Sequence, residues 1–332
     1  MAVLVTGGAG FLGSHIAEEL INMQYDVVVL DDLSGGFLEN VPGGATFIKG
    51  NITDAEIIKQ VFQTYEIEYI FHLAAYAAEN LSHFIRRFNY ENNVVGSMNL
   101  INAAINHHVN CIVFTSSSAV YGNNQLPFHE ELPPIPSDPY GVAKFAVEQD
   151  IKLANMMFNL PYIIFRPHNI YGERQNIGDK YRNVVGIFMN QILQDKPMTI
   201  FGDGQQSRSF SYIKDVAPII AKSIHHQDAY NQVLNIGSDA VVTLNELAAN
   251  IASIMAVKLR IEYLDTRHEV KHVHAAHEKI KKIFGLFAET PLEEGLRKMF
   301  NWVKQHGSRT SKDFEPLEVT KNLPGVWRKR ES

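Results

Sequence analysis

Residues 6–13 read Thr6-Gly7-Gly8-Ala9-Gly10-Phe11-Leu12-Gly13, directly after the apolar run from Met1 to Val5. The run is typical of a buried parallel strand, and residues 12–23 have the apolar spacing of a helix. Glycines at 7, 10 and 13 allow a tight turn, a close backbone approach to a phosphate, and close packing of helix on strand. The helix N-terminus would direct free N–H groups at a pyrophosphate. This position in the chain predicts a dinucleotide site; an ordinary glycine-rich turn is the alternative.

The second apolar run favours one dinucleotide over another. Residues 26–30 read Asp-Val-Val-Val-Leu and end at Asp31 and Asp32. A carboxylate about 20 residues beyond the glycines is where a dinucleotide fold holds the ribose hydroxyls. It would repel a 2′-phosphate, and no arginine or lysine lies between Asp31 and Asn40 to bind one. The pattern predicts NAD rather than NADP, with a plain acidic turn as the alternative.

The composition excludes several classes of protein. Of the 332 residues, 45% are hydrophobic and 20% charged, which describes a globular chain able to bury a sizeable core. The net charge of −6 argues against a nucleic-acid partner, which needs a basic face. A single cysteine, Cys111, excludes a disulfide within one chain. No run reaches the roughly 20 apolar residues of a membrane span, and the N-terminus is typical of a core strand, so we expect a cytoplasmic protein without a membrane partner.

Short apolar runs alternate with helical patterns through the first half of the chain, which predicts an α/β fold with a doubly wound parallel (Rossmann) sheet. Helical patterns cover residues 12–23, 55–65, 90–106 and 140–158. The expected strands are residues 2–5, 27–30, 46–48, 69–73, 111–115 and 162–165.

The alternation breaks after about residue 170, which predicts a smaller second lobe over the carboxyl ends of the strands, where such sheets bind ligands. We expect the lobes to interleave, because residues 233–236 have the character of a further strand of the main sheet. The predicted dinucleotide-binding domain covers 1–168, with a return strand near 213–240. The substrate-binding lobe covers 169–212 and 241–307, and residues 308–332 are a docked or partly disordered extension.

A tyrosine and a lysine four residues apart, Tyr140 and Lys144, stand at the start of a predicted helix and so share one face. Tyrosine has a pKa of about 10 and becomes a usable base only when a nearby cation stabilises the phenolate. Residues 115–122, Thr-Ser-Ser-Ser-Ala-Val-Tyr-Gly, follow the strand 111–115 and place hydroxyls at its carboxyl end. A hydroxyl there can hydrogen-bond the oxygen that the tyrosine deprotonates.

Over about residues 1–305 the chain resembles the extended short-chain dehydrogenase/reductases, specifically the nucleotide-sugar epimerases and dehydratases. The segments that carry the resemblance are Thr-Gly-Gly-Ala-Gly-Phe-Leu-Gly (6–13), His-Leu-Ala-Ala (72–75), Glu-Asn-Asn-Val-Val-Gly-Ser (91–97), Ser-Ser-Ser-Ala-Val-Tyr-Gly (116–122), Arg-Pro-His-Asn-Ile-Tyr-Gly (166–172) and Phe-Gly-Asp-Gly-Gln-Gln-Ser-Arg-Ser-Phe (201–210).

The resemblance implies roles for individual residues. Ser117 would be the catalytic hydroxyl, Tyr140 the base and Lys144 its partner. Asn51 departs from the family's usual aspartate, which weakens the expected contact with the adenine amine. The residues implied to bind NAD are Gly7, Gly10, Phe11, Leu12, Gly13, Asp31, Asp32, Ser34, Gly35, Asn51, Ile52, Leu73, Ala74, Ala75, Asn92, Thr115, Tyr140, Lys144 and Pro167.

The second lobe would hold a nucleotide-diphosphate sugar, with a UDP-sugar favoured. Arg208 and Arg267 would neutralise the diphosphate, because arginine offers a planar fork of donors. Phe201 would pack on the base and Glu269 would accept ribose hydroxyls. The full set is Ser117, Asn169, Asn183, Val184, Phe201, Arg208, Arg267 and Glu269.

Two other features bear on the chemistry. His268, His272, His274 and His277 include an i, i+4 pair that could chelate a metal, but no cysteine accompanies them, so we expect no metal. Helices 90–106 and 140–158, the latter with Phe145, Ile151, Met156 and Met157, are implied by the resemblance to pair with those of a second copy, giving a homodimer.

The pair after Ser117 decides the expected reaction. Family 4,6-dehydratases need an acid and a base there, whereas this chain has Ser118 and Ala119. We expect NAD-dependent 4-epimerisation of a UDP-hexose or UDP-N-acetylhexosamine through a 4-keto sugar. A dehydratase, a decarboxylase, a reductase, a UDP-glucuronate 4-epimerase and a non-enzymatic sensor are the alternatives.

Two residues bear on which sugar is expected. Val273, which by resemblance lies at a position that limits bulk beside the hexose, would admit N-acetyl groups, and Arg174 could reach a sugar carboxylate.

Overall fold

The apolar run at the start of the chain forms β1 (Ala2–Thr6), whose five residues are all buried. In this computed structural model, which describes residues 1–267, 269–286, 289–311 and 313–328, β1 lies inside a seven-stranded sheet of order β11-β6-β5-β4-β1-β2-β3. Every pair of neighbours is parallel, so the fold is the predicted Rossmann-like sheet. The other strands are β2 (Asp26–Asp31), β3 (Thr46–Lys49), β4 (Ile67–His72), β5 (Cys111–Thr115), β6 (Tyr162–Pro167) and β11 (Gln232–Ile236).

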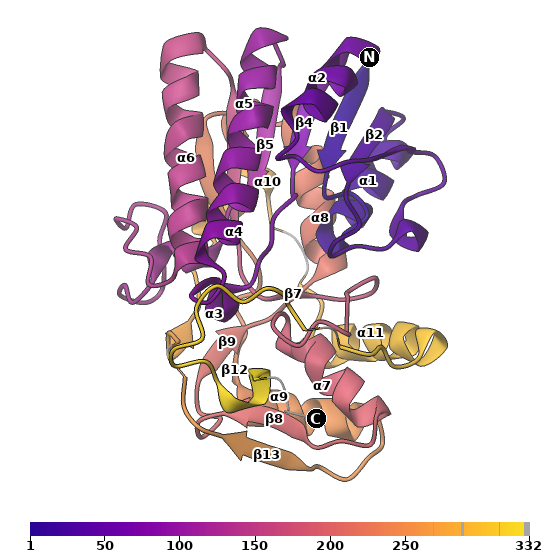
Figure 1. Cartoon of the computed structure of the whole chain (residues 1–332), viewed down its shortest axis with the longest axis vertical. Coiled ribbons are helices and arrows are strands. Elements are labelled where there is room, and N and C mark those ends of the chain that lie inside the picture. Colours follow the sequence, from indigo (N-terminus) through magenta and orange to yellow (C-terminus); the bar gives the residue numbers. More distant parts are fainter. Residues whose placement is uncertain (268, 287–288, 312, 329–332) are drawn as a thin grey trace.

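Helices cover both faces of this sheet, which is why its strands are apolar throughout rather than alternating. On one face lie α2 (Ala55–Thr64), α5 (Gly96–Asn106) and α6 (Pro139–Phe158), which bury a core with Leu4, Ile70 and Ile112 (Figure 1). On the other face α1 (Phe11–Asn22) packs against α8 (Ile213–Lys222) over Val3 and Val5. The predicted return of residues 233–236 to the main sheet is confirmed, since β11 pairs with β6.

The helix expected over 90–106 has a different form in the structure. It is a continuous helical stretch that starts earlier, as α4 (Arg86–Tyr90), passes through a π-helical turn at Glu91–Val95 and continues as α5. The side chain of Asn93, inside the π turn, accepts from the backbone N–H of Tyr76 and donates to its carbonyl. This wider turn brings Asn93 into contact with the loop after β4, a tertiary contact that apolar spacing does not encode.

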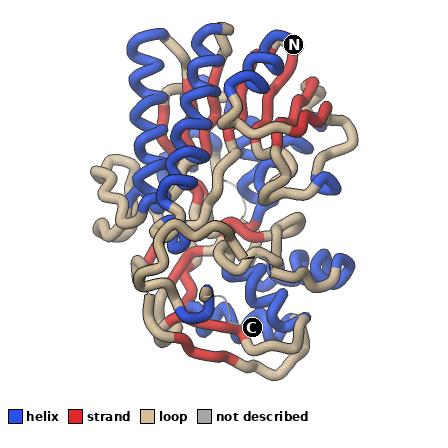
Figure 2. Tube along the Cα trace, in the orientation of Figure 1, coloured by secondary structure: helices blue, strands red, loops and turns tan. Residues whose placement is uncertain are grey.

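The second lobe lies beyond the carboxyl ends of the parallel strands (Figures 1 and 2). Its strands form three small sheets, β10-β7, β12-β9-β14 and β13-β8, and α9 packs against both α7 and α11. The bounds are β7 (Ile170–Tyr171), α7 (Val184–Leu193), β8 (Met198–Phe201), β9 (Ser207–Ser209), β10 (Ser211–Tyr212), β12 (Val241–Thr243), α9 (Leu244–Ile254), β13 (Ile261–Leu264), β14 (His272–Val273) and α11 (Leu292–His306). Between β14 and α11 the chain returns to the main sheet, where α10 (Glu278–Phe284) packs against β11 (Figure 1). A short helix, α3 (Glu79–Ser82), lies at the junction of the two lobes (Figure 1).

The segment that follows α11 is docked over both lobes in its described part. The ring of Phe314 packs on those of Tyr76 and Phe88, with centroids 5.2 and 4.9 Å apart. Trp327 is buried, and its ring meets those of Tyr181 and Phe201 at 5.2 and 6.2 Å. We call residues 308–328 the C-terminal strap. Among the helices of the described ranges, none is long and apolar enough to cross a membrane.

Candidate active site

The glycine turn between β1 and α1 has the geometry that the sequence predicts. Gly7 has φ +72°, which favours glycine, and a Cβ placed on Gly13 would lie 2.1 Å from the carbonyl oxygen of Gly7. The start of α1 has no side-chain cap and no acidic residue in its first turn, so its N–H groups stay available. An uncapped helix start behind a glycine cradle fits the pyrophosphate of a dinucleotide.

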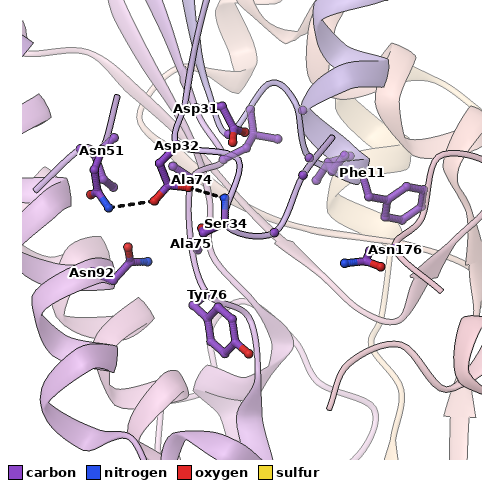
Figure 3. A pocket seen from close by; sticks show the side chains of 18 of the residues that line it. Phe11, Asp31, Asp32, Ser34, Asn51, Ala74, Ala75, Tyr76, Asn92 and Asn176 are labelled. Atoms are coloured by element: carbon purple, nitrogen blue, oxygen red, sulfur yellow. Dashed lines mark hydrogen bonds between the residues drawn. The ribbon is translucent and has the colours of Figure 1, made fainter. Parts of the chain in front are cut away.

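Two carboxylates stand at the end of β2, beside this turn (Figure 3). Asp31 accepts hydrogen bonds from the backbone N–H groups of Ala9 (3.0 Å) and Leu33 (2.8 Å), which fixes it against the glycine turn. Burial raises the pKa of Asp31, while these two hydrogen bonds lower it. Asp32 accepts from the Asn51 side-chain amide at 2.8 Å, so Asn51 is oriented even though it is not the usual aspartate.

A cavity bordered by this turn, which we call the glycine-loop cavity, brings together most of the residues expected to bind NAD. Four residues of the expected set do not line this cavity. Tyr140 and Pro167 line a second cavity. Thr115 and Lys144 line neither cavity, and the Lys144 ammonium donates a hydrogen bond to the Thr115 carbonyl. The expected residues that do line the glycine-loop cavity are Gly7, Gly10, Phe11, Leu12, Gly13, Asp31, Asp32, Ser34, Gly35, Asn51, Ile52, Leu73, Ala74, Ala75 and Asn92.

The tyrosine and lysine lie on one face of α6, as their spacing predicts. Pro139 and an Asp138 cap, which accepts from the backbone N–H of Gly141 at 2.9 Å, start the helix just before Tyr140. One turn later the Lys144 ammonium donates to the Thr115 carbonyl at 2.7 Å and lies 5.9 Å from the centre of the Tyr140 ring. The helix therefore ties the candidate base to the carboxyl end of β5.

Burial shifts the pKa values of both Tyr140 and Lys144. Burial raises the pKa of Tyr140 above its usual value, the charge of Glu79 raises it further, and a hydrogen bond with Ser117 lowers it. Burial lowers the pKa of Lys144 to about 7. Tyr140 therefore needs positive charge from a bound ligand to become a base near neutral pH.

One turn further along the same face lies a buried ion pair that anchors α6. The carboxylate of Glu148 accepts from Arg166 of β6 at 2.6 and 2.9 Å and from the Ser116 hydroxyl at 2.5 Å. Both charged side chains are almost fully buried, with exposed fractions of 0% and 2%. Because Ser116 precedes Ser117 in the chain, this network holds the candidate catalytic hydroxyl next to Tyr140.

A second cavity, of about 470 Å³, lies between the lobes and is lined by Ser117 and Tyr140. We call it the inter-lobe cavity, and its size is that of a small-molecule site. Phe11, Arg182 and Asn183 line both cavities and so join them. The structure brings together here all the residues expected to bind substrate: Ser117, Asn169, Asn183, Val184, Phe201, Arg208, Arg267 and Glu269.

The charged side chains expected to bind the substrate, Arg208, Arg267 and Glu269, already have partners within the protein. The Arg208 guanidinium donates to the backbone carbonyls of Ser207, Val270 and Lys271 at 2.7–2.8 Å. Arg267 is paired with Glu269 at 2.9 Å and stacks 4.2 Å from the centre of the Phe201 ring. The arginines are therefore held in place by protein contacts, and a base stacking on Phe201 would share that ring with Arg267.

Arg182 lines the glycine-loop cavity although the sequence did not predict it, and the position predicted for Arg174 is wrong. Arg182 lies near Gly35 and is paired with Asp179 at 2.5 Å, so a cation does approach the glycine-loop cavity, from a segment remote in sequence. Its partner Asp179 balances its charge, and the carboxylates of Asp31 and Asp32 line the same cavity. The expectation that Arg174 reaches the sugar is wrong, because it pairs with Glu18 at 2.8 Å and lines neither cavity.

Two further groups in the inter-lobe cavity were missed. Glu79, the first residue of α3, lines this cavity, and Trp327 of the C-terminal strap forms part of its wall. No motif marks either residue, since each reaches the site through the folding of a distant segment. A carboxyl group therefore does lie beside Tyr140, although Ser118 and Ala119 supply none.

A small side pocket adjoins Ser117. Ser118, Ala119 and Val273 line it together with Glu79, so Val273 does lie close to the candidate catalytic residues, as expected. Valine leaves more room here than an aromatic residue would.

Of the histidines at 268–277, His272 and His277 have side-chain partners within the protein, whereas Nδ1 of His274 has no hydrogen-bond partner among the described residues. His277 lies within 3.0 Å of His168 and 2.6 Å of Asp239, and His272 hydrogen-bonds Ser207. His268 lies outside the described residues. Among the residues that the structure describes, no three of His, Cys, Asp and Glu are grouped so as to hold a metal ion.

Known proteins are similar to this chain over most of its length. The family model described as "NAD dependent epimerase/dehydratase family" matches residues 3–237. A putative UDP-glucose 4-epimerase of Methanocaldococcus jannaschii is 34% identical over 92% of this chain and 99% of its own. The structure of UDP-glucose 4-epimerase from Thermotoga maritima with UDP-glucose superposes with a TM-score of 0.87 at 32% identity, covering 92% and 99% of the chains. That of UDP-N-acetylglucosamine 4-epimerase from Methanobrevibacter ruminantium, in complex with UDP-N-acetylmuramic acid, gives 0.85 at 33%, covering 92% and 98%.

Proposed function

The chain belongs to the NAD-dependent epimerase/dehydratase family, and from this premise we propose that it catalyses the 4-epimerisation of a nucleotide-diphosphate sugar, with UDP-hexoses and UDP-N-acetylhexosamines as favoured substrates. The observation that carries the proposal is the meeting of two cavities at Phe11, Arg182 and Asn183, one of them lined by Ser117 and Tyr140. One cavity has the cradle of a dinucleotide site, and the other has two arginines that suit a diphosphate.

In the proposed reaction Tyr140 removes the proton of the C4 hydroxyl, and the Ser117 hydroxyl hydrogen-bonds the same oxygen. The residues that line the glycine-loop cavity would hold NAD, which would supply reversible hydride transfer at C4 of the sugar. Lys144 lies one turn further along α6, held by the Thr115 carbonyl, and in its protonated form adds positive charge beside the tyrosine. Arg208 and Arg267 hold the diphosphate, so that the 4-keto sugar can turn over without leaving the site.

The proposal assigns the NAD-binding part to residues 1–168 with the return strand near 213–240, and the substrate lobe to 169–212 and 241–307. We also propose that the enzyme is located in the cytoplasm.

The decisive experiment is incubation of the purified chain with a panel of UDP- and dTDP-sugars in deuterated water, with products analysed by NMR and mass spectrometry. We expect an inverted C4 centre, an unchanged mass and no deuterium at C4, because a hydride carried by bound NAD does not exchange with solvent. Loss of water from the sugar, or deuterium at C5 or C6, would assign the chain to the dehydratases instead.

The first prediction concerns the cofactor. Because the proposal places the ribose at Asp31 and Asp32, which line the glycine-loop cavity, and returns the hydride to its own product, denaturing the purified protein should release about one NAD per chain. Enzymatic assays specific for NAD and for NADP measure the released dinucleotide. NADP in place of NAD would contradict the role given to the two carboxylates and would point to Arg182 as a phosphate-binding group.

A second prediction concerns assembly. The end of α6 presents Met156 and Met157, 75% and 71% exposed, beside Leu153 and Phe158, and we infer that a second copy covers this surface. The role expected for Ile151 is wrong, because Ile151 is buried against its own sheet, whereas Phe145 is only partly buried, beside the cluster that contains Tyr121. Light scattering should give twice the chain mass of 37.4 kDa, and the Met156→Glu, Met157→Glu double variant should give a monomer that keeps its dinucleotide. A wild-type monomer at micromolar concentration would contradict the dimer.

A further inference from the structure

Glu79 places a carboxylate where the sugar of the proposed substrate would lie. It begins α3 at the junction of the lobes (Figure 1) and lines both the inter-lobe cavity and the side pocket. Ser117 and Arg208 line the same two spaces, and the charge of Glu79 acts on Tyr140. The carboxylate is therefore next to the groups expected to hold the C4 oxygen.

The carboxylate of Glu79 forms no hydrogen bond or ion pair with any residue that the structure describes, although arginines lie nearby. The donors of Arg208 are directed at backbone carbonyls and those of Arg267 at Glu269. Protein surrounds Glu79, yet the residue remains exposed, because it borders the cavities rather than packed side chains. Because Glu79 is exposed to the cavities and has no protein partner among the described residues, its carboxylate is free to accept hydrogen bonds from a ligand.

Several charged or titratable groups face Glu79 from other elements. Burial raises the pKa of Glu79 to about 7, Asp138 and Glu269 raise it, and Arg208 and Arg267 lower it. The groups that line the cavities with it, or act on it, are Asp138, Tyr140, His168, Lys180, Arg182, Arg208, Arg267 and Glu269.

We propose that Glu79 determines which sugars the site accepts: its carboxylate accepts hydrogen bonds from the hydroxyl or amide donors of a neutral sugar and excludes nucleotide sugars that carry a carboxylate on the hexose. The proposal rests on the proposed function, because it needs a nucleotide sugar in the inter-lobe cavity. A hexuronate would bring a second negative charge close to Glu79, and like charges at close range repel each other.

The test compares kcat/KM of the full-length, NAD-loaded chain for UDP-glucuronate and for the best neutral UDP-hexose or UDP-N-acetylhexosamine. We expect the wild type to prefer the neutral sugar, and Glu79→Gln to narrow that preference by roughly 10- to 100-fold, mainly through KM for the hexuronate. Glu79→Asp keeps the charge and should keep the preference. Glu66→Gln, an exposed carboxylate before β4, is the matched control.

The pH dependence separates this role from a structural one. In the wild type the preference should weaken from pH 8 to pH 6, as Glu79 becomes protonated, while in Glu79→Gln it should not change with pH. An equal loss of activity on both sugars, an unchanged preference in Glu79→Gln, or a wild type that converts both sugars equally well would overturn the assignment.

Failure of the proposed function has a different signature. If the NAD-loaded wild type converts no nucleotide sugar, the epimerase proposal fails. Glu79 is then judged by calorimetric Kd values for UDP-glucose and UDP-glucuronate on the wild type and on Glu79→Gln. Equal Kd ratios in the two proteins would overturn the role of Glu79 as well.

Discussion

Replacing Tyr140 by phenylalanine is expected to lower turnover by roughly 10²–10⁴-fold, because it removes the group that we propose takes the proton from the C4 hydroxyl. Ser117 stays in place, since its hydroxyl accepts from the backbone N–H of Ala119 and its neighbour Ser116 is bound to Glu148. The loss should therefore appear in kcat, measured by coupled or NMR assay with the neutral substrate.

Substrate binding should survive this change, because Arg208 and Arg267 lie in the other lobe and keep their own contacts. Calorimetry with the UDP-sugar checks this point. Tyr65→Phe, at the end of α2 and away from both cavities, is the matched control and should have normal turnover. Turnover of Tyr140→Phe within a few-fold of the wild type would rule out Tyr140 as the base.

The Glu148→Gln variant is expected to lose about 3–5 kcal/mol of unfolding free energy, since it leaves the Arg166 guanidinium buried without a counter-charge. One nitrogen of Arg166, Nη1, already lacks a hydrogen-bond partner among the described residues, so the site has no spare acceptor for the charge. Urea unfolding of the loaded protein measures the change.

A double variant tests the cause of that loss. Glu148→Leu combined with Arg166→Met removes both charges and should recover most of the stability, because apolar side chains of similar size can replace a buried pair. Glu294→Gln, which breaks the exposed pair with Lys298 at 2.7 Å, is the control and should cost less than about 1 kcal/mol. A cost as small as this in Glu148→Gln would show that the buried pair contributes little.

The sequence predicts those parts of the site that depend on neighbours along the chain. The glycine turn, the carboxylates ending β2 and the Tyr140–Lys144 face each lie within one strand–turn–helix unit, so local periodicity and turn chemistry suffice to place them. The order of these units along a parallel sheet then brings their carboxyl ends to one edge.

The groups that sequence reasoning missed are set by long-range packing. Arg182 reaches Gly35 across a separation of about 150 residues, Trp327 reaches Phe201, and Glu79 enters the cavity because α3 packs under α6. None of them has a periodic neighbour or a motif. The failure at Arg174 has the same origin, since its partner Glu18 lies on α1, far away in sequence.

The C-terminal strap supplies the last residues of the inter-lobe cavity to be synthesised. Translation proceeds from the N-terminus, so residues 308–328 leave the ribosome after every other residue that lines the two cavities. A nascent chain that ends before Trp327 can already pair all seven parallel strands and form the glycine turn. Its inter-lobe cavity would still lack the indole wall beside Phe201, so the glycine-loop cavity can form during synthesis before the inter-lobe cavity is complete.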